Sequence, residues 1–136
     1  MTVYIFDTNS FSKIIMNYYE SCFPSFWTAF DSMIKNNQII SVKEVYLEMN
    51  YPKKLNDWAK ENKEIFKIAD NIEAEFVKEI FKNKHFRNHL IKPSMSKDYK
   101  IIADPFIIAK AYNLKGCIVT ELGFLSSSVT IQPFKL

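Results

Sequence analysis

The chain has 136 residues, a net charge of +3 and an apolar content of 48%. This length suits one domain with a sizeable core, so we expect residues 1–136 to form a single domain. The two glycines, Gly116 and Gly123, exclude glycine-rich phosphate loops, which need several glycines close together. No apolar run reaches membrane-spanning length and no secretory leader is evident, which predicts a cytoplasmic protein without a membrane partner.

The first half of the chain alternates strand and helix patterns. Residues 3–6 form a continuous apolar run, typical of a strand covered on both faces of a parallel sheet. Apolar spacing over 11–18 predicts a helix capped near Asn9 or Ser10, and Pro24 suits the first turn of a second helix. A short strand at 38–41 is then followed by a helix over 42–51 that Pro52 ends.

The second half continues the alternation. Residues 53–84 keep a helical apolar spacing and predict two helices with a bend, followed by a polar loop over 91–100. A helix over 103–113 has a proline in its first turn, and strands are expected over 114–120 and 126–134. Strands that alternate with helices predict an α/β fold with a mostly parallel sheet of four or five short strands, flanked by helices.

The two cysteines, Cys22 and Cys117, lie in apolar sequence surroundings without a partner at metal-ligand spacing. We expect two buried free thiols, as is usual in a reducing compartment.

Acidic residues stand at the boundaries of several predicted elements. They are Asp7 after the first strand, Glu44 and Glu48 on one face of a helix, Asp104 at a helix start and Glu121 after Thr120. In open α/β sheets the functional residues lie beyond the carboxyl ends of the strands. Carboxylates gathered there would suit Mg²⁺ or Mn²⁺ and metal-assisted cleavage of a phosphodiester. Simple alternatives stay open, namely helix capping by Asp7 or Asp104 and solvent exposure of the glutamates.

Three segments together resemble the PIN-domain family, in its small single-domain toxin-like branch. They are "YIFDTNSF", "ISVKEVYLEM" and "ADPFIIAKAYNLKGCIVTE". The resemblance implies a three-layer fold and a Mg²⁺- or Mn²⁺-dependent endoribonuclease that leaves 5′-phosphate and 3′-hydroxyl ends. It also implies the toxin of a type II toxin–antitoxin pair, with RNA as substrate and a cognate antitoxin as partner.

The resemblance also implies roles for individual residues. Asp7, Glu48, Asp104 and Glu121 would be the catalytic and metal-binding acids. Supporting residues would be Thr8, Asn9 and Thr120, with Glu44 as a weaker candidate one turn before Glu48.

The chain departs from the family after Thr120. Leu122 stands where the family commonly has a second acid. This departure keeps open a weakened or inactive PIN-like domain that binds RNA or a protein partner without cutting. The aromatic residues over 18–30 keep open contacts with an antitoxin or within a homodimer, although core packing explains most of them.

A basic segment over 81–92 interleaves cations with aromatic residues. Its cations are Lys82, Lys84, Arg87 and Lys92, which suit RNA phosphates, but an ordinary helix end explains them as well. His85 and His89 are four residues apart, yet no third ligand stands at zinc-motif spacing.

A rival enzyme class is the haloacid-dehalogenase-type phosphatase, because the segment "FDTNS" resembles the nucleophile loop of that class. That loop requires a second acid, and this chain has Asn9 at the position. An aspartyl-phosphate on Asp7 would favour this rival.

Overall fold

The protein is described by a computed structural model that covers residues 1–82, 103–120 and 130–133. Its five strands are β1 Tyr4–Phe6, β2 Ile39–Val42, β3 Phe66–Lys67, β4 Cys117–Thr120 and β5 Thr130–Pro133. They form one sheet in the order β3-β2-β1-β4-β5. The pairs among β3, β2, β1 and β4 are parallel, and β5 is antiparallel to β4. The predicted fold class, a mostly parallel α/β sheet with helical cover, is confirmed.

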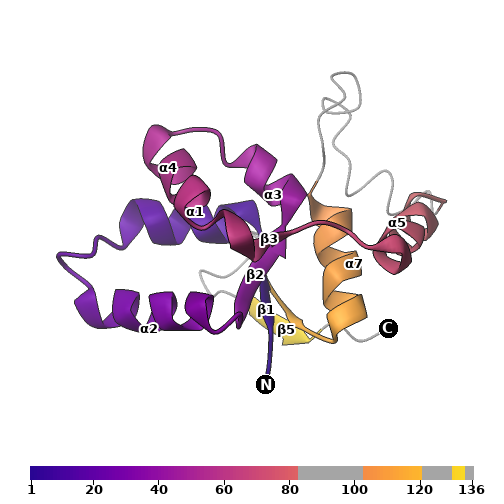
Figure 1. The fold of residues 1–136 in the computed structure, drawn as a ribbon, viewed down its shortest axis with the longest axis horizontal. Coiled ribbons are helices and arrows are strands. Elements are labelled where there is room, and N and C mark those ends of the chain that lie inside the picture. Colours follow the sequence, from indigo (N-terminus) through magenta and orange to yellow (C-terminus); the bar gives the residue numbers. More distant parts are fainter. Residues whose placement is uncertain (83–102, 121–129, 134–136) are drawn as a thin grey trace.

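Helices cover both faces of this sheet. They are α1 Thr8–Asn17, α2 Pro24–Lys35, α3 Lys43–Glu48, α4 Lys53–Glu61, α5 Asn71–Lys82 and α7 Asp104–Leu114, with a 3₁₀ turn η1 at Lys63–Ile65. Figure 1 shows α1, α2 and α4 on one side of the sheet, with α7 and then α5 on the other. In the part of the chain that the structure describes, no helix is long and apolar enough to span a membrane.

The core lies between the sheet and the first helices. All four residues of β2 are buried, as is usual for a central strand of a parallel sheet, and the strand lies one residue later than the predicted range 38–41. Phe11 on α1 is fully buried, and its ring centroid lies 5.0 Å from that of Phe6 and 5.1 Å from that of Trp58. These contacts bind β1, α1 and α4 together directly beneath the edge where β1 ends.

The prediction of two helices joined by a bend over 53–84 was wrong for the residues between the helices. The chain leaves α4 at Glu61, passes through η1 and enters β3, which pairs with β2 through Ser41 and Phe66. Ile65 and Phe66 are buried there. A strand of two residues is too short to show a period of its own, so tertiary pairing decided it.

Two further predictions were wrong. Asp7, rather than Asn9 or Ser10, is the N-cap of α1. The cysteines are free, but Cys22 is exposed and Cys117 is only half-buried.

Pro24 begins α2 as predicted. Of the aromatic residues near it, Trp27 and Phe30 are buried, whereas Tyr19 and Phe23 are exposed.

Candidate metal and nuclease site

The candidate site lies at the edge where the parallel strands end. Asp7 follows β1, Thr120 is the last residue of β4, and α3 begins directly after β2. The parallel register of β1 with β4 places Phe6 beside Val119, so the next residues, Asp7 and Thr120, lie side by side at the end of the two strands. The topology therefore brings together residues that are more than a hundred positions apart in the sequence.

Asp7 is held on both carboxylate oxygens. Its side chain is buried, with 7% of the residue exposed. Oδ1 accepts the N–H of Ser10 at 2.8 Å, which caps α1, and Oδ2 accepts the hydroxyl of Thr120. The Asp7 N–H donates to the Val119 carbonyl at 3.2 Å. The capping alternative is thus confirmed, while the second oxygen still faces the end of β4.

Glu48 joins α3 to the starts of two other helices. Its Oε2 accepts the hydroxyl of Thr8, the first residue of α1. Its Oε1 accepts the backbone N–H of Ala103 at 3.3 Å, just before Asp104 begins α7. Asp104 is exposed and lies in the first turn of α7, whose N-cap is Ala103. Glu48 therefore lies between the segment that carries Asp7 and the segment that carries Asp104.

Glu44 differs from Glu48 although both lie on α3. It is half-buried, and its Oε2 is a buried oxygen without a hydrogen-bond partner among the described residues. A buried carboxylate oxygen that lacks a donor is costly, and a cation would relieve that cost. Asn9, the other supporting candidate, is exposed.

Several predicted residues lie outside the described part of the chain. They are Glu121, Leu122, Lys84, His85, Arg87, His89 and Lys92. Of the basic segment, Lys82 is described: it is exposed and its Nζ lies 2.9 Å from Oε1 of Glu79. The hydrogen bond and charge of Glu79 raise the pKa of Lys82 above its usual 10.5.

The donor chemistry of the edge suits a hard cation. Asp7 and Glu48 are engaged by hydroxyls and amides, and neither takes part in the ion pairs found among the described residues. Within residues 1–82, 103–120 and 130–133, however, no three histidine, cysteine or acidic side chains lie close enough to hold a metal. The carboxylates fit Mg²⁺ or Mn²⁺ by type, and they would have to move closer to share one ion.

Sequence reasoning missed two serines that support this edge. Ser41 on β2 is fully buried, and its hydroxyl donates to the Phe6 carbonyl at 2.6 Å. The Ser10 hydroxyl donates to the Val119 carbonyl at 3.2 Å. A serine inside the apolar strand pattern of 39–42 was the available signal for Ser41, because a buried hydroxyl needs a partner.

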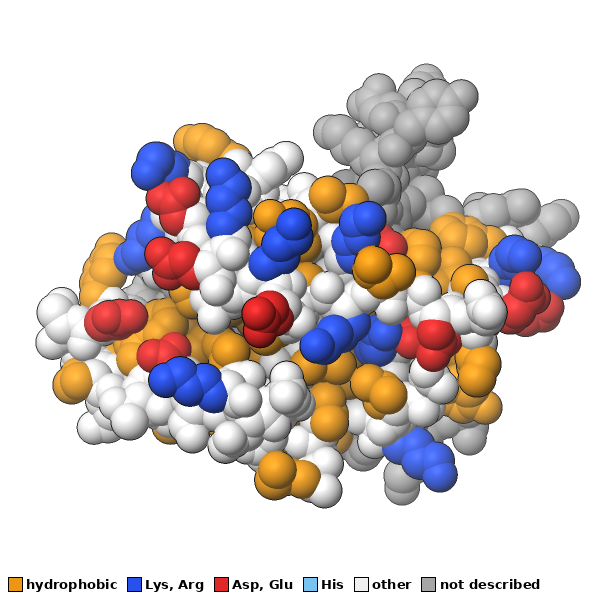
Figure 2. All heavy atoms as spheres, viewed as in Figure 1, with side chains coloured by type: hydrophobic (Ala, Val, Ile, Leu, Met, Phe, Trp, Pro, Cys, Tyr) orange, Lys and Arg blue, Asp and Glu red, His pale blue; other side chains and the backbone are white. Residues whose placement is uncertain are grey.

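A separate hollow lies among α1, α2 and α4. Its volume is about 460 Å³. It is lined by Ile15, Tyr18, Tyr19, Glu20, Ser21, Trp27, Lys54, Asp57, Trp58 and Glu61. Figure 2 shows apolar surface between α4 and α2 with charged side chains around it. Part of the predicted aromatic segment thus lines a surface hollow in addition to packing in the core.

One protein family matches almost the whole chain. It is DUF4411, described as a domain of unknown function, and the match covers residues 4–127. The chain belongs to DUF4411. The matched region contains every acid of the candidate site, from Asp7 to Glu121. Comparisons with curated proteins and with solved structures gave no match.

Proposed function

We propose that this DUF4411 protein is a metal-dependent endoribonuclease, as the PIN resemblance implies. The observation that carries the proposal is the position of Glu48, which hydrogen-bonds to Thr8 beside Asp7 and to Ala103 beside Asp104. The segments that carry the three acids Asp7, Glu48 and Asp104 thereby meet at one sheet edge. Such oxygen-rich edges suit metal-assisted phosphodiester hydrolysis.

In this proposal the acids would hold Mg²⁺ or Mn²⁺, and the bound ion would activate water and offset charge on the leaving oxygen. Asp7, Glu48 and Asp104 are the ligands, and Glu121 is the next candidate. Thr120 and Thr8 orient the carboxylates of Asp7 and Glu48 through their hydroxyls. Glu44 offers a further oxygen that has no partner among the described residues.

The direct test is cleavage of a mixed RNA pool by the purified protein. We expect cutting with Mn²⁺, no cutting with EDTA, and a loss of at least about a hundredfold in Asp104→Asn, because a neutral amide is a poor ligand for a hard cation. Asp31→Asn is the matched control, since Asp31 is exposed on α2 and lies outside the site. Product ends should be 5′-phosphate and 3′-hydroxyl.

Two outcomes would count against the proposal. Cutting that survives EDTA or the Asp104 substitution would contradict a carboxylate–metal site. Well-folded wild-type protein that binds RNA but never cuts it would favour the non-catalytic alternative, in which the change at Leu122 has removed activity.

We further propose that the protein acts in the cytoplasm as the toxin of a toxin–antitoxin pair. The aromatic hollow beside Tyr19, which is 54% exposed, supports a protein partner, because aromatic residues are enriched in interfaces. Controlled expression should arrest growth for the wild type and for Asp31→Asn, and not for Asp104→Asn. Equal growth in all three strains would contradict a toxic nuclease.

A further inference from the structure

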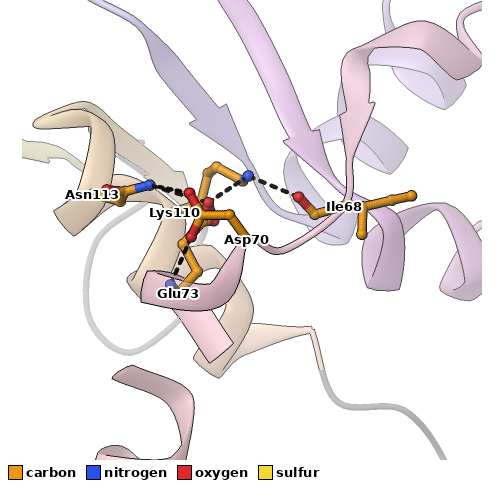
Figure 3. Close-up of polar contacts among 5 residues, drawn as sticks. All are labelled: Ile68, Asp70, Glu73, Lys110 and Asn113. Atoms are coloured by element: carbon orange, nitrogen blue, oxygen red, sulfur yellow. Dashed lines mark hydrogen bonds and ion pairs between the residues drawn. The ribbon is translucent and has the colours of Figure 1, made fainter. Parts of the chain in front are cut away.

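A buried ion pair joins α5 to α7 away from the candidate site. Figure 3 shows Lys110 of α7 directed toward Glu73 of α5, with Nζ 2.7 Å from Oε1. Lys110 Nζ also donates to the Ile68 carbonyl at 3.2 Å, just before α5. Asn113 donates to Asp70 Oδ2 at 2.9 Å and to Glu73 Oε1 at 3.3 Å. We refer to Ile68, Asp70, Glu73, Lys110 and Asn113 as the clasp.

Removing the charged groups of the Lys110–Glu73 pair from water costs free energy. The side chains of this ion pair, Lys110 and Glu73, are 7% and 1% exposed, and Glu73 Oε2 has no hydrogen-bond partner among the described residues. Apolar residues of similar size are often at least as stable as a buried ion pair. Stability alone is therefore a poor explanation for these charges, whereas a requirement for one defined geometry explains them.

Helix α7 needs such a constraint along its axis. It packs toward the sheet through Ile107 and Ala111 and through its N-cap residue Ala103, which are spaced four residues apart and buried. Apolar contacts of this kind are non-directional, and small alanine side chains give few ridges to resist sliding. The hydrogen bonds of Lys110 and Asn113 are directional, and they tie α7 to the segment that follows β3.

We propose that Lys110 and Glu73 are positioning residues for the candidate metal site. Lys110 lies six residues after Asp104 on the same helix, about 9 Å along its axis at 1.5 Å per residue. A shift of α7 at the clasp moves its first turn equally. The clasp thereby sets where Asp104 and the Ala103 N–H stand relative to Glu48. This inference rests on the proposed function for its metal readout only.

The test compares single and double apolar replacements. Lys110→Met leaves Glu73 buried without its cation and should lower the urea midpoint, while Lys110→Met with Glu73→Met should restore it. In the double variant without metal, we expect the Ala103 amide to exchange about tenfold faster. Half-maximal RNA cleavage should need about tenfold more Mn²⁺, with the rate at saturating Mn²⁺ within about twofold of wild type.

Lys78→Met is the matched control. Lys78 also lies on α5 and pairs with Glu75 at 3.2 Å, but both side chains are mostly exposed. This variant should leave the Ala103 exchange and the Mn²⁺ dependence unchanged. Asn113→Ala provides a milder change that keeps the ion pair, and it should speed the exchange of the Ala103 amide in the same direction.

Particular results would overturn the positioning role. A double variant that recovers the wild-type urea midpoint, and that also has wild-type Ala103 exchange and wild-type Mn²⁺ dependence, would show that the clasp does not position the site. If the double variant does not fold, an unchanged exchange rate of the Ala103 amide in Asn113→Ala would also overturn the positioning role. Because amide exchange needs no catalysis, a wild type that cuts no RNA would count against the proposed function while the exchange results still decide the clasp.

Discussion

At the scale of single residues, Asp7 combines a structural and a proposed chemical role. One oxygen caps α1 through Ser10, and the other receives the hydroxyl of Thr120. Because the carboxylate is pinned from both sides, it is preorganised for a ligand at the strand edge. The two roles can be separated, because capping requires only an acceptor oxygen, whereas a hard cation is held more strongly by a charged carboxylate than by a neutral amide.

Asp7→Asn should therefore keep the fold and lose the proposed activity. Asparagine caps helices about as well as aspartate, so the free energy of unfolding should change by less than about 0.5 kcal/mol. Asp7→Ala should cost about 1 kcal/mol, because the Ser10 N–H loses its partner. Urea unfolding and Mn²⁺-dependent cleavage measure the two effects, and an Asn variant that cuts RNA normally would exclude Asp7 as a ligand.

At the scale of elements, the turn from α7 into β4 shows how closely the layers approach. A Cβ on Gly116 would meet the side chain of Ile5 and lie 2.8 Å from the Val3 carbonyl. The preceding residue, Lys115, ends α7 with φ at 52°, the left-handed conformation in which glycine is favoured. Both neighbouring positions therefore favour glycine, and the chain has glycine only at the second of them.

Substitutions at these two positions should change the stability of the protein in opposite directions. Gly116→Ala should destabilise the protein by about 1–3 kcal/mol, because the added methyl group overpacks β1. Lys115→Gly should stabilise it by about 0.5–1 kcal/mol, because it removes the strain of a side chain at positive φ. Denaturant unfolding at a common temperature checks both, and stabilisation by Gly116→Ala would refute the close approach.

At the scale of the whole molecule, the candidate site depends on the assembled sheet. Asp7, Glu48 and Asp104 belong to separate segments, and the parallel order β2-β1-β4 brings those segments to one edge. A metal bound there would hold these segments together only in the folded state. Binding should therefore stabilise the whole protein by mass action.

Mn²⁺ should raise the thermal midpoint of the wild-type protein. At a hundred times its dissociation constant the gain is about 2.7 kcal/mol, which corresponds to a rise on the order of 10 °C for a chain of this size. Glu48→Gln should abolish most of this rise, whereas Asp31→Asn should retain it. A rise that is equal in all three proteins would indicate Mn²⁺ binding elsewhere.

Local patterns in the sequence were enough to predict the fold class and most of the elements. A continuous apolar run predicted β1, a short strand was predicted over 38–41 where β2 lies, and Pro24 and Pro105 marked the first turns of α2 and α7. These signals are local, since they depend on burial of a whole strand or on the backbone of one residue. The boundary positions of Asp7, Glu48 and Asp104 could be predicted for the same reason.

Which side chains contact one another depends on how the folded elements are arranged. The two-residue strand β3 forms because its backbone pairs with β2. The apolar spacing of 53–84 does not predict this strand. The donors to Glu48 come from Thr8 and Ala103, and Lys110 finds Glu73 on another helix. Such pairs join residues 37 to 55 positions apart, and chain folding, rather than any local pattern, sets their distance.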